Sequence, residues 1–82
     1  MPEFLYVYIL RSEVSPDHYY VGITEDLRAR LKKHNAGSVP YTSNLRPWKL
    51  NTAVAFRDHD RATAFERYLK STSGRAFARK RL

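Results

Sequence analysis

The sequence predicts a small domain of mixed α/β (α+β) class, in which helices flank a three-stranded antiparallel sheet in the order ββαβαα. Three observations favour this class. Two apolar stretches of strand length follow one another near the amino end, an alternating stretch begins at Trp48, and helical spacing appears between and after them. The 82 residues are enough for one domain, residues 1–82, with a single compact core.

The first two expected strands form a hairpin. Phe4–Arg11 (FLYVYILR) is almost continuously apolar, which is typical of a strand buried on both faces, and we expect it to be central in the sheet. The polar segment Ser12–Asp17 contains Pro16 and predicts a turn. His18–Ile23 (HYYVGI) is then the second strand, and the short connection favours antiparallel pairing.

A first helix is expected to follow. Thr24 can cap it, and Glu25 and Asp26 would lie in its first turn, where acidic side chains interact favourably with the helix dipole. Gly37 is expected to end it. The residues at helical spacing that would form its buried face are Leu27, Leu31 and His34.

A loop over Ser38–Pro47 leads to the third expected strand, Trp48–Arg57, in which apolar and polar residues alternate. Its expected buried face comprises Trp48, Leu50, Thr52, Val54 and Phe56. Asp58 or Asp60 would cap the following helix. The buried stripe of that helix is expected to comprise Ala62, Phe65 and Leu69. Ser73–Gly74 should break the helix before a last basic helical piece over Arg75–Leu82.

Charge is distributed unevenly along the chain. Residues 1–27 contain five acidic residues and one basic residue, whereas residues 28–82 contain fourteen Lys or Arg residues and three acidic ones. The formal net charge is +7. A basic surface on a small domain favours an anionic partner, and nucleic acid is the commonest such partner. The alternative is a basic shell that serves only solubility.

Several classes of protein and site are disfavoured. The absence of cysteine excludes disulfides and thiolate zinc sites, and it fits a reducing cytoplasmic compartment. The longest apolar run, Phe4–Leu10, is too short to span a membrane, and Glu3 and Arg11 flank it, so neither an anchor nor a signal peptide is expected. The chain also has no P-loop, no paired-carboxylate motif and no Cys/His cluster.

Tyrosine, arginine, histidine and one glutamate are the candidate chemical groups. Tyr8 and Tyr20 lie on paired strands and could flank one water molecule, although a phenol with a pKa near ~10 is a poor base unless cations lower that value. Arg30 and His34 are four residues apart, so they share a helix face and could supply that field at a phosphate. The alternatives are aromatic packing for the tyrosines and a solvated basic face for the helix.

Glu66 borders the apolar stripe of its helix, so its carboxylate could point toward the sheet; the alternative is a surface ion pair with Lys70. Gly22 either marks a strand bulge or allows a close approach of backbone or substrate. The triplet Asp58–Asp60 (DHD) resembles a metal cluster, but three consecutive residues at a helix start converge poorly on one ion, which favours capping.

These residues resemble a known family. Tyr6–Tyr8 (YVY) and Tyr20–Gly22 (YVG) are similar to the two half-motifs of the GIY-YIG nuclease superfamily. The stretch from Tyr20 to His34, with Arg30, resembles the family's segment from YIG through the first helix, and Glu66 stands where the family keeps a metal-binding glutamate. The resemblance covers almost the whole chain.

Two segments refine the resemblance. Residues 70–77 (KSTSGRAF) are similar to the ending of small stand-alone bacterial members, and residues 46–50 (RPWKL) resemble the nuclease subunit of eukaryotic branched-DNA resolvases. The chain departs from the family at Tyr6, which replaces a glycine, and at Ile23, where several members have a lysine. It also has no asparagine beyond Asn51, whereas several members have one late in the last helix.

The resemblance implies a DNA endonuclease with one divalent ion, Mg²⁺ or Mn²⁺, bound by Glu66. It implies Tyr8 or Tyr20 as the general base, and Arg30 together with His34 as the groups that stabilise charge on the phosphate. Contacts to the nucleic acid are expected from Gly22, Arg28, Lys32, Lys33, Arg75 and Arg79.

Two other functions stay open at this point. One is a DNA- or RNA-binding module of the same fold that does not cut, which Ile23 and the missing asparagine favour. The other is a nuclease subunit that needs a partner protein to deliver its substrate. Branched and single-stranded DNA are both open as substrates, and so is the oligomeric state.

Overall fold

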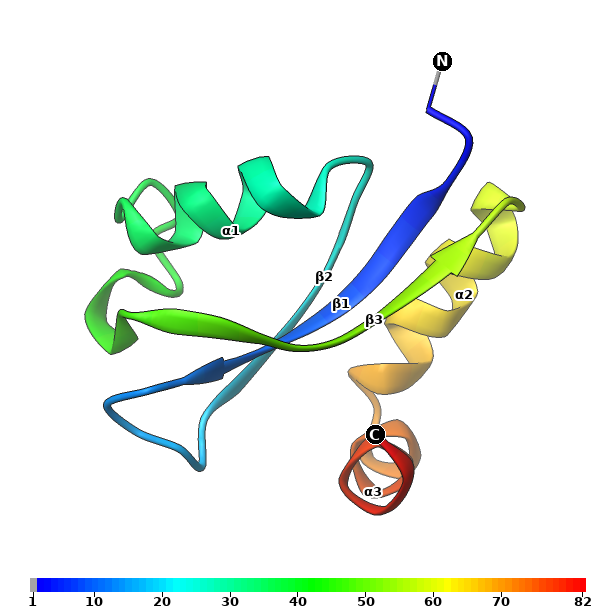
Figure 1. The fold of residues 1–82 in the computed structure, drawn as a ribbon. Coiled ribbons are helices and arrows are strands. Elements are labelled where there is room, and N and C mark those ends of the chain that lie inside the picture. The colour runs from blue at the N-terminus through cyan, green and yellow to red at the C-terminus, as the bar shows by residue number, and fades with distance from the viewer. Residues whose placement is uncertain (1) are drawn as a thin grey trace.

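The computed structural model describes residues 2–82 and has the expected ββαβαα order (Figure 1). A short 3-10 helix, η1, precedes the third strand. The elements are β1 Leu5–Ser12, β2 Tyr19–Thr24, α1 Leu27–Asn35, η1 Ser43–Leu45, β3 Trp48–Phe56, α2 His59–Leu69 and α3 Thr72–Arg81. No helix within residues 2–82 combines the length and the apolar character that crossing a membrane requires.

The sheet has the order β2-β1-β3, and both pairings are antiparallel. The prediction that the first strand is central is therefore confirmed. Four consecutive residues of β1, Val7–Leu10, are buried, because helices cover both faces of this strand. In the register, Tyr8 lies opposite Gly22 of the edge strand β2 and opposite Ala53 of β3.

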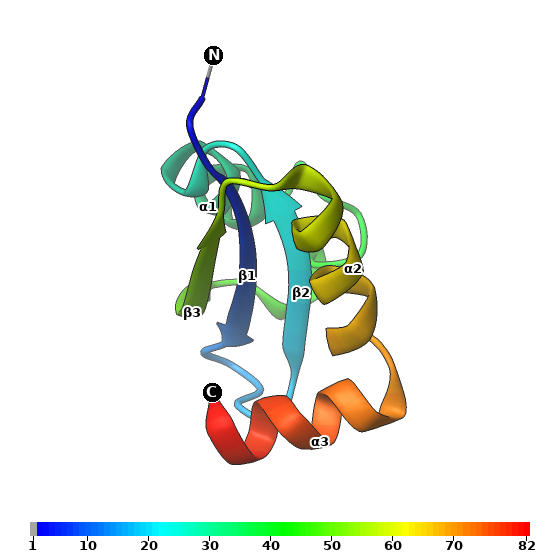
Figure 2. The same cartoon turned by 90° about the vertical axis from the view of Figure 1, so that its right-hand side faces the viewer.

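Alternate residues of β1 pack into two different clusters. Val7 and Ile9 pack against Ala62 and Leu69 of α2, with residues of α3 nearby. Tyr8 and Leu10 pack on the opposite face with Trp48 and with Leu27 and Leu31 of α1. Figure 2 shows α2 running beside β2 and α3 crossing the lower end of the sheet. The edge strand β2 thus lies between α1 on one face and α2 on the other.

The prediction of one buried face for the third strand is wrong. A register shift between Ile9 and Leu10 leaves Asn51 as an extra residue between their partners, Thr52 and Leu50. One extra residue reverses which face the following side chains point to. Trp48 therefore packs on the α1 face, whereas Phe56 packs on the α2 face. Leu50, expected to be buried, is exposed.

The start of α1 also differs from expectation. Asp26, not Thr24, caps α1: its carboxylate accepts a hydrogen bond from the backbone N–H of Ala29, so no acidic residue lies in the first turn. Thr24 instead accepts the backbone N–H of Asp26 and holds the turn before the cap. Gly37 follows the helix end with φ of +81°, as its predicted role requires.

The break between α2 and α3 falls earlier than expected. Ser71 caps α3 by accepting the backbone N–H of Gly74, so Ser73 and Gly74 lie inside the helix. Gly74 is buried in the first turn, and a Cβ there would collide with the backbone carbonyl of Tyr68. The glycine thus permits a close approach of the two helices and does not end one of them.

Candidate active site

Tyr8 places its phenol in the interior, on the face of the sheet that α1 covers. Only 2% of the residue is exposed. Its hydroxyl lies 3.0 Å from Nε2 of His34, which α1 brings over the strand from its last turn. His34 is 1% exposed, which confirms that it belongs to the buried face of the helix. A strand and a helix far apart in the sequence thus share one buried hydrogen bond.

Gly22 provides the space for the Tyr8 ring. The two residues are paired across β1 and β2 in regular register, so Gly22 marks no bulge. A Cβ at Gly22 would lie against the phenol, 2.5 Å from Cζ of Tyr8. The close-approach interpretation of this glycine is therefore the one that fits, and the group approaching it is a tyrosine side chain.

A chain of hydrogen bonds fixes the tautomer of His34. The hydroxyl of Thr42 donates to the carbonyl of Val39 at 3.2 Å, so its oxygen accepts from Nδ1–H of His34 at 2.8 Å. With the proton on Nδ1, Nε2 carries a lone pair and accepts from the Tyr8 hydroxyl. The carbonyl of Thr42 in turn accepts from Nε1–H of Trp48 at 2.8 Å.

Thr42 was missed by the sequence interpretation. It lies in the irregular loop between α1 and β3, and its spacing from His34 follows no helical or strand periodicity. Buried threonine in a loop bounded by prolines is not a signal in itself. Only the three-dimensional path of the loop brings its hydroxyl to the imidazole.

Burial keeps both members of the Tyr8–His34 pair neutral. Desolvation raises the pKa of Tyr8 to about 12, and the nearby Arg30 guanidinium offsets this only in part. Desolvation, followed by the charge of Arg30, lowers the pKa of His34 below its usual value. Arg30 thus lowers the pKa of the Tyr8 phenol, as expected, but the cost of burying a phenolate exceeds the attraction of one guanidinium, so the net shift is upward.

Tyr20 lies beside this pair. Its ring centroid is 4.8 Å from that of His34 and 6.4 Å from that of Tyr8. The residue is only partly buried, so Tyr20 forms the outer side of the aromatic cluster while Tyr8 forms its interior. The two phenols are therefore not equivalent, although the sequence alone treats them alike.

Arg30 is the cation next to the phenol. It precedes His34 by one helical turn on α1, and its buried Nε has no hydrogen-bond partner among residues 2–82. A buried donor without a partner is costly and is typical of a site that receives an acceptor from a ligand. Both nitrogens of His34, in contrast, are already engaged. Arg30 is thus the residue of this cluster with an unsatisfied donor, while the shared contact of Arg30 and His34 with a phosphate stays a prediction.

Glu66 comes from α2, on the other face of the sheet. Its side chain is 16% exposed, and its charge is close enough to contribute to the raised pKa of Tyr8. Lys70, one turn later, places Nζ 2.7 Å from Oε2 of Glu66. The Glu66 side chain is therefore largely buried and also forms the ion pair with Lys70, although we expected only one of these two arrangements.

The donor set available to a divalent ion is small. Within residues 2–82, no three His, Cys, Asp or Glu side chains converge on one point. Glu66 offers one carboxylate. The Lys70 ammonium group already lies beside it, which shows that a positive charge can occupy this position. A hard cation that keeps most of its water ligands needs no more than one or two carboxylates, and Glu66 fits that type of site.

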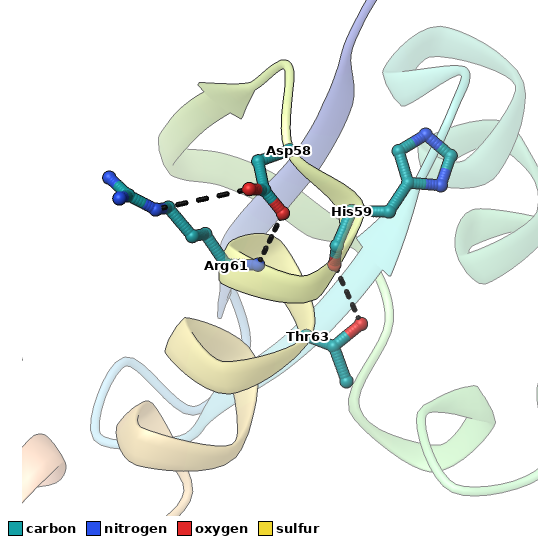
Figure 3. A network of polar contacts seen from close by, with 4 residues as sticks. All are labelled: Asp58, His59, Arg61 and Thr63. Atoms are coloured by element: carbon teal, nitrogen blue, oxygen red, sulfur yellow. Dashed lines mark hydrogen bonds and ion pairs between the residues drawn. The ribbon is translucent and has the colours of Figure 1, made fainter.

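The Asp58–Asp60 triplet is a helix start, as predicted. Asp58 accepts the backbone N–H of Arg61 at 3.1 Å and also forms a long ion pair with its side chain (Figure 3). The imidazole of His59 points away from the Asp58 carboxylate, and the His59 carbonyl accepts from the Thr63 hydroxyl. The triplet therefore does not form a metal site.

The basic residues expected to contact nucleic acid separate into two groups. Arg28, Lys32 and Lys33 are exposed on α1, whereas Arg75 and Arg79 are exposed on α3. Figure 1 places α1 and α3 at opposite sides of the sheet. The fold brings Tyr8, Tyr20, Arg30, His34 and Gly22 together, with Glu66 within electrostatic range, but it does not gather the outer cations on one surface.

Comparison with known proteins decides the family. The model of the GIY-YIG catalytic domain matches residues 4–81. The chain belongs to the GIY-YIG family. The two half-motifs that define this family thus meet where Tyr8 of β1 lies over Gly22 of β2.

Relatives fall into two groups. The structure-specific endonuclease subunit SLX1 of the yeast Meyerozyma guilliermondii is 47% identical over 55 residues, which cover 60% of this chain and 18% of the yeast protein. A UPF0213 protein of Streptococcus pneumoniae is 39% identical over 66 residues, which cover 79% of this chain and 65% of the relative. A UPF0213 protein of Halalkalibacterium halodurans is 37% identical over 71 residues, which cover 85% of this chain and 73% of the relative. The chain therefore spans a small part of the SLX1 proteins and most of the bacterial ones.

Proposed function

We propose that this GIY-YIG domain is a metal-dependent endonuclease that hydrolyses phosphodiester bonds in DNA. The observation that carries the proposal is the buried Tyr8–His34 hydrogen bond, with the unpartnered Nε of Arg30 beside it. A proton acceptor and a free cationic donor in one site are what attack of water on a phosphodiester requires. The SLX1 relatives, which are named as structure-specific endonuclease subunits, support the same reaction class.

In this proposal Tyr8 relays a proton and His34 stores it. The phenol remains protonated at neutral pH, because its pKa is raised to about 12, so it is not a preformed base. The phenol oxygen accepts a proton from the attacking water while the phenol proton passes to Nε2 of His34. The water oxygen then bonds to phosphorus, the bond to the leaving oxygen breaks, and His34 holds the proton removed from water.

Arg30 and Tyr20 assist from either side of the phenol. The Arg30 guanidinium donates to the phosphate oxygens and stabilises the charge that develops there. Tyr20, partly exposed and 4.8 Å from the His34 ring, keeps bulk water from the imidazole and orients the substrate.

Glu66 would hold the divalent ion, Mg²⁺ or Mn²⁺, through its single carboxylate. When bound, such an ion would act as a Lewis acid toward the phosphate and its leaving oxygen. Lys70 would have to release the carboxylate for this to happen, since its ammonium group is already 2.7 Å from Oε2.

A second candidate is a subunit that needs a partner before it cuts. The observation that favours it is the Lys70–Glu66 ion pair, which keeps the proposed metal ligand engaged. The SLX1 relatives carry the word subunit in their names and are several times longer than this chain. A partner would then be required to deliver the DNA. A non-cutting binding module is the third candidate, favoured by Ile23 and the missing late asparagine.

The test is cleavage of single-stranded, nicked, flapped and four-way DNA with Mg²⁺ or Mn²⁺. Wild-type protein should cut at least one of these substrates, and Tyr8→Phe should slow cutting by about 10²-fold or more, because the relay is lost. Tyr41→Phe is the matched control, since this exposed tyrosine lies outside the site and should leave the rate unchanged. A wild-type protein that binds DNA but cuts none of the substrates would contradict the proposal.

A further inference from the structure

A groove lies outside the Tyr8–His34 cluster, and of its lining residues only Tyr20 and Lys70 take part in the reaction described above. It measures about 840 Å³ and lies between the sheet, the β1–β2 turn and α3. This size falls in the roughly 300–1,000 Å³ range of ligand sites. Of all the elements, β2 and α3 contribute the most lining residues, and Figure 2 shows that α3 crosses the lower end of β2.

The groove combines an apolar floor with cationic sides. Val21 of β2 and Ala78 of α3, both partly buried, form the apolar part that a ligand can reach, and they pack against the buried core residues Ile9 and Leu69. The charged side chains that line it are Lys70, Arg75, Arg79 and a single acid, Asp17. The groove is therefore positively charged along its sides.

Two residues connect the groove to the proposed active site. Lys70 lines the groove and holds Glu66 by the 2.7 Å ion pair. Tyr20 also lines the groove, while its ring packs against His34. A chain of nucleotides whose scissile phosphate lies at Arg30 can therefore continue past the edge strand β2 into the groove.

We propose that the groove binds the unpaired segment of a nucleic-acid strand next to the scissile phosphate. Arg75 and Arg79 contact its phosphates, the apolar floor takes its bases, and Tyr19, which is 49% exposed and lines the groove, is the stacking platform. The bases of a duplex are stacked inside the double helix, so their faces cannot contact the apolar floor of the groove. This proposal rests on the proposed nuclease function and specifies its substrate as DNA that includes a single-stranded part.

The first experiment compares the binding of a labelled 12-nucleotide single strand and a 12-base-pair duplex in EDTA, where no metal-dependent cutting occurs. The double variant Arg75→Ala/Arg79→Ala should weaken single-strand binding about tenfold or more, and duplex binding much less. The control is Arg57→Ala/Arg61→Ala, which removes the same charge at exposed sites near the start of α2, far from α3. Equal losses for both oligonucleotides, or equal effects of both double variants, would overturn the proposal.

Two single variants test the two kinds of contact separately. Tyr19→Ala should weaken single-strand binding about five- to 100-fold and leave duplex binding unchanged, because it removes one stacking surface. Asp17→Asn should tighten single-strand binding, since it removes the one acid of the groove lining from an exposed turn. Unchanged single-strand affinity in both variants would contradict a strand in this groove.

Binding and cleavage separate this proposal from the one on which it rests. If the wild-type protein cuts DNA but the groove variants bind and cut single-stranded and flapped substrates as it does, the groove assignment is wrong and the nuclease function stands. If the groove variants lose single-strand binding and no preparation cuts any substrate, the groove is confirmed as a binding site and the nuclease function is wrong.

Discussion

At the scale of single residues, the most informative group is one that the sequence interpretation did not include. Thr42 donates to the Val39 carbonyl and therefore has to accept from His34. That acceptance places the imidazole proton on Nδ1 and leaves Nε2 free to accept from Tyr8. A loop hydroxyl thus decides which nitrogen of His34 is basic.

Thr42→Val keeps the shape of the side chain and removes this acceptor. We expect it to destabilise the fold by roughly 1–3 kcal/mol, because Nδ1–H is left buried without a partner. We also expect the imidazole to change tautomer and cleavage to slow by about tenfold or more. Nitrogen NMR shifts of His34 report the tautomer independently of activity, and Thr42→Ser should restore both readouts. Wild-type shifts in Thr42→Val would show that Thr42 does not set the tautomer.

The pH dependence of stability follows from the lowered pKa of His34. Because the folded state favours neutral His34, the stabilising effect is fully present above pH ~6.5 and is lost as the pH falls through the lower folded pKa. Denaturant unfolding between pH 7.5 and about pH 5 should therefore show a fall in stability that His34→Gln removes. His59→Gln, at an exposed histidine, should behave like the wild-type protein. Parallel curves for all three proteins would contradict a buried neutral His34.

At the scale of elements, the sequence predicted the strands and helices well because each has its own periodicity. The apolar run of β1 and the helical spacing of Leu27, Leu31 and His34 depend only on local patterning. The bulge at Asn51 could not be predicted, because the alternation of β3 continues through it without interruption. Asp26 and Thr24 are both good caps, so local chemistry did not determine which of them begins α1.

In the candidate site, too, the identity of the residues could be predicted from the sequence, but their environments could not. Tyr8, Arg30, His34 and Glu66 were recognisable from the family motif, but their different environments were not. Whether a phenol is buried, and whether a guanidinium outweighs that burial, depends on packing between β1 and α1. The contact between Gly22 and Tyr8 likewise arises from strand pairing, which the two half-motifs alone do not specify.

One prediction concerns helix α2, in which Glu66 and Lys70 are one turn apart. Lys70→Met keeps an unbranched side chain but removes the ammonium group from Glu66, so Mn²⁺ should bind more tightly, by about threefold or more. Glu66→Gln should abolish measurable Mn²⁺ binding and cleavage while the fold and DNA binding persist, because glutamine keeps the shape and loses the charge. Titration calorimetry with Mn²⁺ measures this without DNA. If Glu66→Gln bound Mn²⁺ and cut DNA as the wild-type protein does, Glu66 would not be the metal ligand.

At the scale of the whole molecule, the important fact is that the excess positive charge lies on two separated helices. The net charge is +7, yet Lys32 and Lys33 lie on α1 while Arg75 and Arg79 lie on α3, across the sheet. In our proposal, a nucleic acid that contacts both helices passes the edge strand β2, next to Tyr8 of β1 and Arg30 of α1. A nucleic acid bound only by general charge attraction has no such restriction.

The salt dependence of binding distinguishes these two cases. For a substrate with a duplex and a single-stranded arm, about 4–6 phosphate contacts should give a log–log slope of roughly −3 to −5. Lys32→Ala/Lys33→Ala and Arg75→Ala/Arg79→Ala should each reduce the steepness by about 1 to 2, and their combination should reduce it by about the sum, because separate contacts release separate counterions. If one molecule of DNA contacted only one helix, just one of the two double variants would change the slope. A slope near zero for the wild-type protein would remove the electrostatic interpretation altogether, since without released counterions the phosphates are not the groups being bound.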